Sequence, residues 1–242
     1  MKVAVLMPVY NHLAFLPKAV ESILNQTHQD LTLFIIDDGS TEDVADYIYG
    51  LADSRIDFYR RTKSAGLTRC LNMMLDRASR LGADVFARQD SDDWSEPTRI
   101  AQQLARLQGT VGLVTTYAQA HNANGKPIAN DYCDRIARPS EHPDPERLRS
   151  YNILIDASSL FTRKAFGQIG HYDERLYIGQ TYNYHLRIAQ AGFEIRVMPT
   201  SLYHVRKHSD QVRHRMRGKI QLDGEECNRK CREWAKANPV IW

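Results

Sequence analysis

The chain of 242 residues is 43% hydrophobic and 25% charged, a composition typical of a globular protein and not of a disordered or fibrous one. Lys+Arg 32 against Asp+Glu 29 give a net charge of only +3, so we expect no nucleic-acid partner. The four cysteines form no complete metal set and no window approaches the roughly 18 apolar residues of a membrane span, so we predict a cytoplasmic protein with reduced thiols.

The first half of the chain alternates between strand and helix patterns. Residues 3–9 form a short, Val-rich apolar run that is typical of a strand buried on both faces. Apolar residues recur at helical spacing over 13–24, and a β-type run follows at 31–36. The alternation continues with a helix over 41–51, a strand over 56–59, a helix over 67–81 and a strand over 84–87. This order predicts an α/β fold with a doubly wound, mostly parallel sheet.

After Trp94 the chain no longer alternates regularly between strand and helix patterns. We expect a helix near Pro97, a strand over 112–120, and helical patterns over 160–169 and 182–191. The Pro-rich segment 138–145 is interpreted as a loop, because a linker between domains is usually longer and more polar. We therefore predict a single domain over 1–242, composed of a ligand-binding half (1–120), a mixed half (121–211) and a basic C-terminal helical tail (212–242).

The ends of the first two strands carry side chains suited to a nucleobase. Ligands of a doubly wound sheet bind beyond the carboxyl ends of its strands. The first strand ends in Pro8-Val9-Tyr10, which offers an aromatic face at the rim of the crevice. The second ends at Asp38, whose carboxylate can accept a hydrogen bond from a base N–H. The alternative for residues 38–41 is a turn that caps the next helix.

Three carboxylates follow the fourth strand within four residues. Arg88 is followed by Asp90, Asp92 and Asp93. Such crowding is costly unless a cation neutralises it. Mg²⁺ or Mn²⁺ typically binds one or two carboxylates together with substrate phosphates. The pattern therefore predicts a metal-diphosphate site, and the alternative is a solvated acidic turn before the helix at Pro97.

The chain carries five motifs, at residues 5–11, 21–27, 37–41, 66–72 and 87–93, the last followed by Pro97 and Arg99. Their order and spacing resemble those of the inverting family 2 glycosyltransferases, which have the GT-A fold. The resemblance is strong over 1–120 and continues more weakly through 158–163, 170–176 and 186–187 to about residue 211. It implies that 1–120 bind a nucleotide sugar and that 121–211 form the acceptor side.

The resemblance also implies roles around the nucleotide. Tyr10, with Pro8 beside it, would stack on the base, and Asp38 would hydrogen-bond the base. Arg69 or Arg88 would add positive charge near the phosphates.

Around the metal, the resemblance implies that Asp90 holds the ribose or the metal. Asp92, with or without Asp93, would bind the Mn²⁺ or Mg²⁺ that bridges the diphosphate. His208 lies where the family often has a basic segment that closes over the donor and is a candidate ligand; the alternative is a surface histidine in a basic stretch. The implied activity is transfer of a sugar, from a UDP-sugar, to a saccharide, glycolipid or glycoprotein acceptor with inversion. The basic C-terminal segment would contact the inner face of the cell membrane peripherally.

The chain departs from the family pattern at the position of the catalytic base. The family's acidic Glu-Asp pair aligns with Gln180 and Thr181, and a frequent further Asp aligns with Asn183. None of these side chains can be a carboxylate base. Three alternatives remain open: another group is the base, the protein binds a donor without transferring its sugar, or these positions were altered from a native sequence.

Asp156 is the first candidate for a substitute base. It lies in a strand-like segment near the expected acceptor side, and its alternative role is to cap or support that loop. Asp173 and Glu174 lie in the loop before the replaced motif, and His185 is on the same helix as Thr181 but about one turn away. A nucleotide-sugar-binding protein without transfer activity is the competing hypothesis. A dinucleotide enzyme is disfavoured because no GxGxxG follows the first strand.

Overall fold

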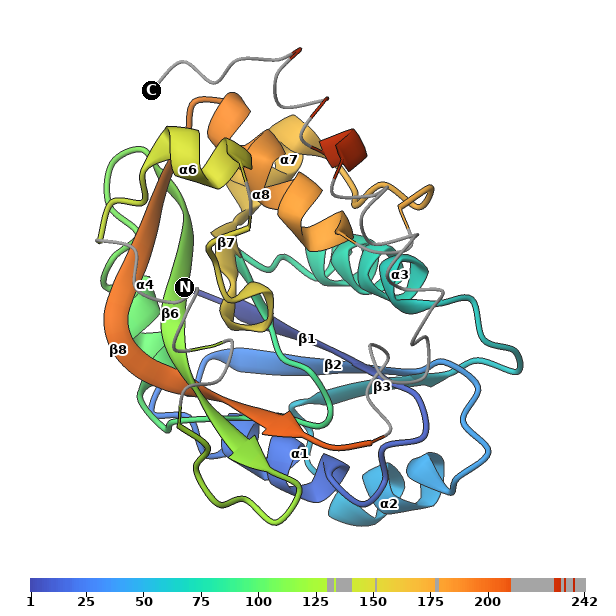
Figure 1. Cartoon of the computed structure of the whole chain (residues 1–242). Coiled ribbons are helices and arrows are strands. Elements are labelled where there is room, and N and C mark those ends of the chain that lie inside the picture. The colour runs from blue at the N-terminus through green and yellow to red at the C-terminus, as the bar shows by residue number, and fades with distance from the viewer. Residues whose placement is uncertain are drawn as a thin grey trace.

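The structure is a computed structural model, and it describes residues 1–129, 133, 141–150, 152–176, 179–209, 229–231, 233 and 237. An eight-stranded sheet with the order β3-β2-β1-β4-β7-β6-β8-β5 forms its centre. Helices cover both faces of this sheet (Figure 1). The predicted α/β class, with a parallel first half and a mixed second half, is confirmed.

Parallel strands joined by helices build the N-terminal half. The strands are β1 (Val3–Val9), β2 (Leu31–Asp37), β3 (Ile56–Arg60) and β4 (Val85–Arg88), and the helices between them are α1 (Leu16–Leu24), α2 (Val44–Leu51) and α3 (Leu67–Arg80). Strand β1 lies between β2 and β4 and is parallel to both. The carboxyl ends of these three strands therefore meet at one edge of the sheet.

The second half adds antiparallel pairs to the same sheet. Its elements are β5 (Trp94–Ser95), α4 (Arg99–Leu104), β6 (Val111–Asn122), α6 (Pro145–Ser150), the 3₁₀ turn η1 (Asp156–Ser158), β7 (Leu160–Thr162), α7 (Arg163–Ile169), α8 (Gln180–Gln190) and β8 (Glu194–Lys207). Strand β7 pairs antiparallel with β4 on one side and β6 on the other, and so joins the two halves. The long strands β6 and β8 run parallel beside it (Figure 1).

Two sequence-based expectations for this half are corrected by the structure. Residues 160–169 were predicted to be helical throughout, but they begin as β7, because Leu160 and Phe161 are buried against β4 and β6. Asp156 was expected in a strand-like segment and instead begins the turn η1. The turn brings the chain from α6 into the sheet and places Asp156 at its edge.

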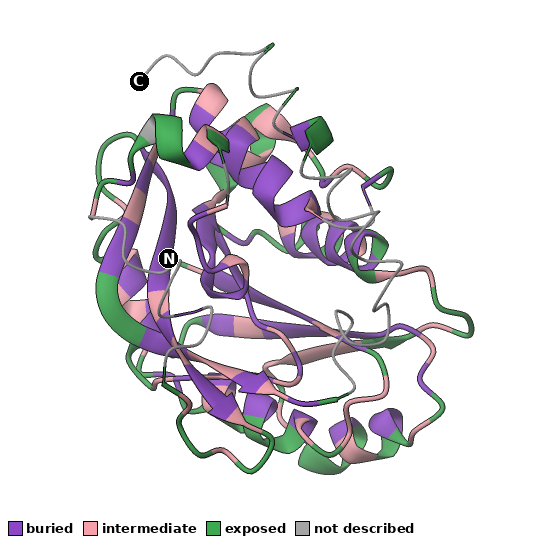
Figure 2. Cartoon of the chain, in the orientation of Figure 1, coloured by how far each residue is buried: buried purple, intermediate pink, exposed green. Residues whose placement is uncertain are grey.

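Two hydrophobic cores hold the sheet, one on each face. Successive side chains of β1 point to opposite faces, so Val5 and Met7 pack with α1 and α2, while Ala4 and Leu6 pack with α3 and α8. Strands β1, β2 and β4 are almost entirely buried, whereas β3 and the middle of β8 are partly exposed (Figure 2). Burial on both faces explains their continuous apolar sequences and provides a rigid support for the loops at their ends.

The predicted helical tail over 212–242 lies outside the described residues except at 229–231, 233 and 237. Its contact with a membrane stays a prediction. Within the described ranges, every helix is too short or too polar to cross a membrane.

Candidate functional site

The loops after β1 and β2 are tied to each other at the strand ends. Asn11 has a left-handed backbone with φ 53°, and its side-chain oxygen accepts a hydrogen bond from the Thr41 backbone at 2.8 Å. Its own N–H donates to Ser40 Oγ at 3.0 Å. Pro8 lies within β1, whereas Tyr10 lies just beyond the strand and is 40% exposed. Tyr10 therefore lies half exposed on a loop that the hydrogen bonds of Asn11 hold in place. The roles of Pro8 and Tyr10 in binding a base stay predictions.

Asp38 anchors the loop that leads into α3. Its carboxylate accepts hydrogen bonds from Ser64 Oγ at 2.7 Å, Ala65 N at 2.9 Å and Gly66 N at 2.8 Å, and it lies 3.1 Å from Arg61 Nε. Burial acts to raise the pKa of Asp38, but the hydrogen bonds from Ser64 and the two backbone amides outweigh it and lower the pKa. Asp38 therefore stays ionised as a loop anchor, and its contact with a base stays a prediction.

The two candidate phosphate-side arginines occupy different environments. Arg69 is exposed on α3, whereas Arg88 is only 2% exposed at the end of β4. Arg88 Nη2 lies 2.7 Å from Asp90 Oδ1, and Nη1 donates to Thr181 Oγ1 at 3.5 Å. Burial acts to lower the pKa of Arg88, but the charge of Asp90 outweighs it, so the pKa is raised. Arg88 is thus a buried cation that links the acidic loop to the start of α8.

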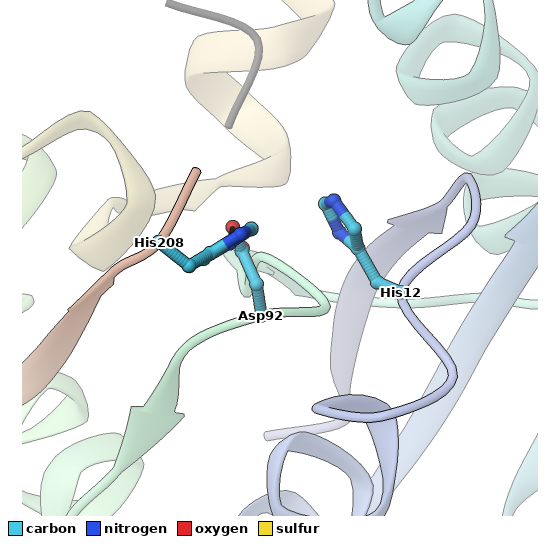
Figure 3. A group of neighbouring side chains, drawn as sticks. All are labelled: His12, Asp92 and His208. Atoms are coloured by element: carbon cyan, nitrogen blue, oxygen red, sulfur yellow. Dashed lines mark hydrogen bonds and ion pairs between the residues drawn. The ribbon is translucent and has the colours of Figure 1, made fainter. Parts of the chain in front are cut away.

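Asp92 faces two imidazole rings. His208 Nε2 lies 2.9 Å from Asp92 Oδ2, and His12 from the loop after β1 approaches from the other side (Figure 3). Burial acts to raise the pKa of Asp92, but the hydrogen bond with His208 and the nearby His12 lower it. One ring nitrogen of each histidine and one carboxylate oxygen of Asp92 all lie within 4.8 Å of one another.

Asp93 contacts β8. Its Oδ1 accepts a hydrogen bond from the Arg206 backbone N–H at 2.8 Å, and burial together with the charges of Asp92 and Asp90 raises its pKa well above the usual range. Oxygens of Asp90, Asp92 and Asp93 also lie within 4.8 Å of one another. The structure therefore brings the three predicted carboxylates together with His208, and Asp92 belongs to both groups. The chemistry of either group suits a divalent cation.

Asp156 begins η1 and lies beside His185 of α8. It accepts a hydrogen bond from Asn152 Nδ2 at 2.9 Å, and His185 Nδ1 lies 3.6 Å from its Oδ1. Burial raises the pKa of Asp156 to about 6, against the effect of the Asn152 hydrogen bond, while 39% of the side chain remains exposed. Burial, with Arg88 nearby, lowers the pKa of His185 to about 3, so His185 adds no positive charge beside this carboxyl.

Helix α8 itself carries no Asp or Glu. Its sequence over Gln180–Gln190 is QTYNYHLRIAQ. Gln180, Thr181 and Asn183 are all buried, and Thr181 contacts Arg88 rather than the open crevice. An acidic base on this helix is therefore excluded by composition.

The other acidic candidates on this side have structural partners. Asp173 Oδ2 lies 2.7 Å from Arg175 Nη2, and Glu174 accepts a hydrogen bond from Asn72 Nδ2 at 3.1 Å. The contact with Asn72 holds the loop before α8 against α3, and the Asp173–Arg175 pair lies within that loop. Asp156 thus remains the candidate whose surroundings favour proton uptake.

Sequence reasoning missed His12 and left His185 without a role. His12 follows Tyr10 by two residues in the loop after β1, which is where a doubly wound sheet binds ligands, and that position was the available signal. His185 Nε2 lies 2.9 Å from Ser159 Oγ, across 26 residues, a separation that no local pattern reveals.

Comparisons with known proteins find glycosyltransferases similar to this chain. The family model described as Glycosyl transferase family 2 matches residues 4–170. EpsE of Bacillus subtilis, which carries a provisional glycosyltransferase name, is 28% identical over 225 residues, 88% of this chain and 76% of EpsE. The chondroitin synthase of Escherichia coli is 28% identical over 195 residues, 78% of this chain. The chain spans only 27% of that synthase and 15% of an uncharacterized Rickettsia bellii glycosyltransferase to which it is 35% identical over 108 residues.

Solved structures share the fold. Staphylococcus aureus TarS 1-349, in complex with UDP-GlcNAc, superposes with a TM-score of 0.71 at 14% identity, over 87% of this chain and 60% of the TarS chain. The mannosyltransferase PcManGT from Pyrobaculum calidifontis, in complex with GDP-Man and Mn²⁺, superposes with a TM-score of 0.67 at 15% identity, over 91% of this chain and 60% of that chain. The expected GT-A fold is confirmed.

Proposed function

The chain belongs to glycosyltransferase family 2, and from this premise we propose that it transfers a sugar from a nucleotide-sugar donor to an acceptor hydroxyl with inversion. One observation carries the proposal. The ends of β1, β2 and β4 bring the exposed ring of Tyr10 and the carboxylate of Asp92 to one edge of the sheet, and Asp156, whose pKa burial raises to about 6, begins η1.

The strand-end residues bind the donor in this proposal. Tyr10 stacks on the base, and Asp38 holds the loop beneath it. Asp92, together with Asp93 or His208, holds Mn²⁺ or Mg²⁺, which supplies positive charge against the leaving diphosphate. We propose a UDP-sugar as the donor, supported by the UDP-GlcNAc complex of TarS; the GDP-Man and Mn²⁺ of PcManGT support a metal-assisted nucleotide sugar more generally.

The transfer step needs one proton acceptor. The acceptor oxygen forms a bond to the anomeric carbon, while the bond from that carbon to the diphosphate oxygen breaks on the opposite face and its electron pair leaves with the diphosphate. The hydroxyl proton passes to the carboxylate of Asp156. A pKa of about 6 leaves this carboxyl mostly ionised at neutral pH and more basic than an ordinary aspartate.

We propose a saccharide, glycolipid or glycoprotein as the acceptor. The basic segment after residue 211 would place the protein at the cytoplasmic face of the membrane, where it would act peripherally.

A second candidate function is a donor-binding protein without transfer activity. The specific observation in its favour is that Gln180 and Thr181 stand where the family has acidic residues. Donor binding is common to both candidates, whereas turnover is not.

The test of donor binding is thermal stabilisation by a panel of nucleotide sugars with Mn²⁺, with Mg²⁺ and with EDTA. A ligand at about 100 times its Kd adds roughly 2.7 kcal/mol to the stability of the native state, so the melting temperature rises. We expect one nucleotide family to stabilise the chain only with a cation, and Asp92→Asn to remove the effect. Asp76→Asn, at a half-exposed position on α3 that pairs with His171, is the control. Stabilisation by no nucleotide sugar, or equal stabilisation in EDTA, would contradict the proposal.

A further inference from the structure

We propose that His12 completes a cation site with Asp92 and His208, and that this two-imidazole, one-carboxylate site selects a transition-metal dication such as Mn²⁺ over Mg²⁺. The proposal rests on the proposed function only for the remaining ligands, which would be diphosphate oxygens of the donor. His12 is outside every residue set that the family resemblance implies.

Three strand ends bring these ligands together. His12 follows β1, Asp92 follows β4 and His208 follows β8, and their rings and carboxylate converge (Figure 3). His208 Nε2 lies 2.9 Å from Asp92 Oδ2, and the two imidazole rings are 5.5 Å apart between centroids at an interplanar angle of 89°. Ligand atoms about 2.1 Å from one ion lie roughly 3 Å apart, so atoms already within 4.8 Å need only a small contraction.

The surroundings hold both rings in place. His12 Nδ1 lies 3.0 Å from Ser91 Oγ, a contact of the kind that orients metal-ligating histidines. The His208 ring packs on Phe15 with centroids 4.5 Å apart, and its side chain is 3% exposed. Its Nδ1 is buried, and no described residue hydrogen-bonds it. The other ring nitrogen, Nε2, faces Asp92 and is the atom that would bind a cation.

The neighbouring carboxylates are less available for a cation. Asp90 is bound by the buried guanidinium of Arg88 at 2.7 Å. Asp93 accepts a hydrogen bond from the Arg206 backbone N–H at 2.8 Å. Asp92 is therefore the carboxylate that is available to bind a cation. The nearest further ligand atoms are the ring nitrogens of His12 and His208.

The ligand types set the class of cation. Mg²⁺ prefers oxygen ligands alone, whereas imidazole suits transition metals. Three protein ligands leave further coordination positions open, as a metal that also binds a diphosphate requires.

The experiment measures metal binding to the full chain without nucleotide. Free Mn²⁺ is followed by electron paramagnetic resonance, Mg²⁺ competes for the site, and Co²⁺ reports nitrogen ligation through its visible absorption. We expect one Mn²⁺ per chain, bound at least about 10-fold more tightly than Mg²⁺. His12→Ala should weaken Mn²⁺ binding on the order of 10-fold or more and alter the Co²⁺ spectrum. His12 is only half buried, so this variant should fold, which its melting temperature checks.

His142→Ala is the matched control, because this histidine is 62% exposed and contacts Glu194 at the opposite end of β8 from His208. Unchanged Mn²⁺ binding and Co²⁺ absorption in folded His12→Ala would overturn the inference, as would equal affinity for Mg²⁺ or no metal binding at all. If the metal binds as expected but no nucleotide sugar stabilises the chain, the result would support this site and contradict the proposed function. Donor binding that needs a metal but is unchanged in His12→Ala would contradict this inference and leave the proposed function standing.

Discussion

In the proposed function, the carboxylates of the donor side and of the acceptor side have opposite environments. On the donor side, Asp38 and Asp92 are surrounded by hydrogen-bond donors and imidazole rings that lower their pKa values. On the acceptor side, Asp156 has an amide and a neutral histidine beside it, and burial raises its pKa to about 6. A carboxylate held in its charged form can bind or position a ligand, whereas one that resists ionisation can take up a proton. This difference is what the proposed division requires, with binding on the donor side and proton transfer on the acceptor side.

Removing the acceptor-side carboxylate should have the largest effect. Asp156→Asn keeps the shape of the side chain but cannot accept a proton, so we expect kcat to fall by about 10²–10⁴-fold. Donor affinity should stay unchanged, because the donor site is built by other strand ends. Steady-state kinetics with a separate donor titration measure the two effects. Full activity of this variant would show that binding and proton transfer are not divided in this way.

Removing an aromatic from the donor side should affect binding instead. Stacking of a base on an aromatic ring contributes on the order of 1–3 kcal/mol, so Tyr10→Ala should weaken donor binding by roughly 5- to 150-fold. Calorimetric titration in saturating Mn²⁺ measures this loss. Tyr59→Ala removes an equally large exposed ring from β3 and is the control. Equal affinities in both variants would assign Tyr10 to the surface rather than to the donor site.

The pH dependence of turnover should reveal the acceptor-side carboxyl. Asp156 must be ionised to take a proton, so kcat should fall as pH drops through about 6, by about 10-fold for each further pH unit. The groups that face it are Asn152 and His185, with Arg88 and Asp90 acting at longer range. His185, with its pKa of about 3, stays neutral across this range.

Measuring kcat at saturating donor and cation separates the fall in kcat at low pH from any change in donor or metal binding. A profile that is flat from pH 5 to 8 in a variant that still binds donor would contradict the assignment of Asp156.

Restoring a carboxylate on α8 should have the smallest effect. Thr181 is buried against Arg88, so the side chain introduced by Thr181→Asp would pair with that guanidinium. We expect little change in kcat, because Asp156 accepts the proton in the proposed mechanism. A gain approaching the about 10²–10⁴-fold of a general base, in this variant or in Gln180→Glu, would show that the base position is empty in this chain.

Much of the donor side could be predicted from the sequence because its signals are local. The apolar run of β1 and the acidic turn after β4 each lie within about ten residues, and parallel strands bring their ends together. His208 and Asp92, by contrast, meet across 116 residues, and only the family resemblance suggested that pair. His12 gave no signal beyond its place in a strand-end loop.

The acceptor side was harder to predict because its contacts depend on antiparallel pairing. Strand β7 has three residues, too few for a periodic pattern, and its partner β4 lies more than seventy positions earlier. The turn η1 and the position of Asp156 depend on this pairing. The surroundings that raise the pKa of Asp156 were therefore visible only in the folded chain.

Release of a nucleoside diphosphate from the donor tests the central claim most directly. Phosphorus NMR can follow the full chain with Mn²⁺, the nucleotide sugar that stabilises it, and saccharide or glycolipid acceptors. The account predicts acceptor-dependent release of the diphosphate that stops in EDTA and is slowed in Asp156→Asn without loss of donor binding. Tight, metal-dependent donor binding with no release for any acceptor would contradict it and identify the protein as a donor-binding member of the family without transfer activity.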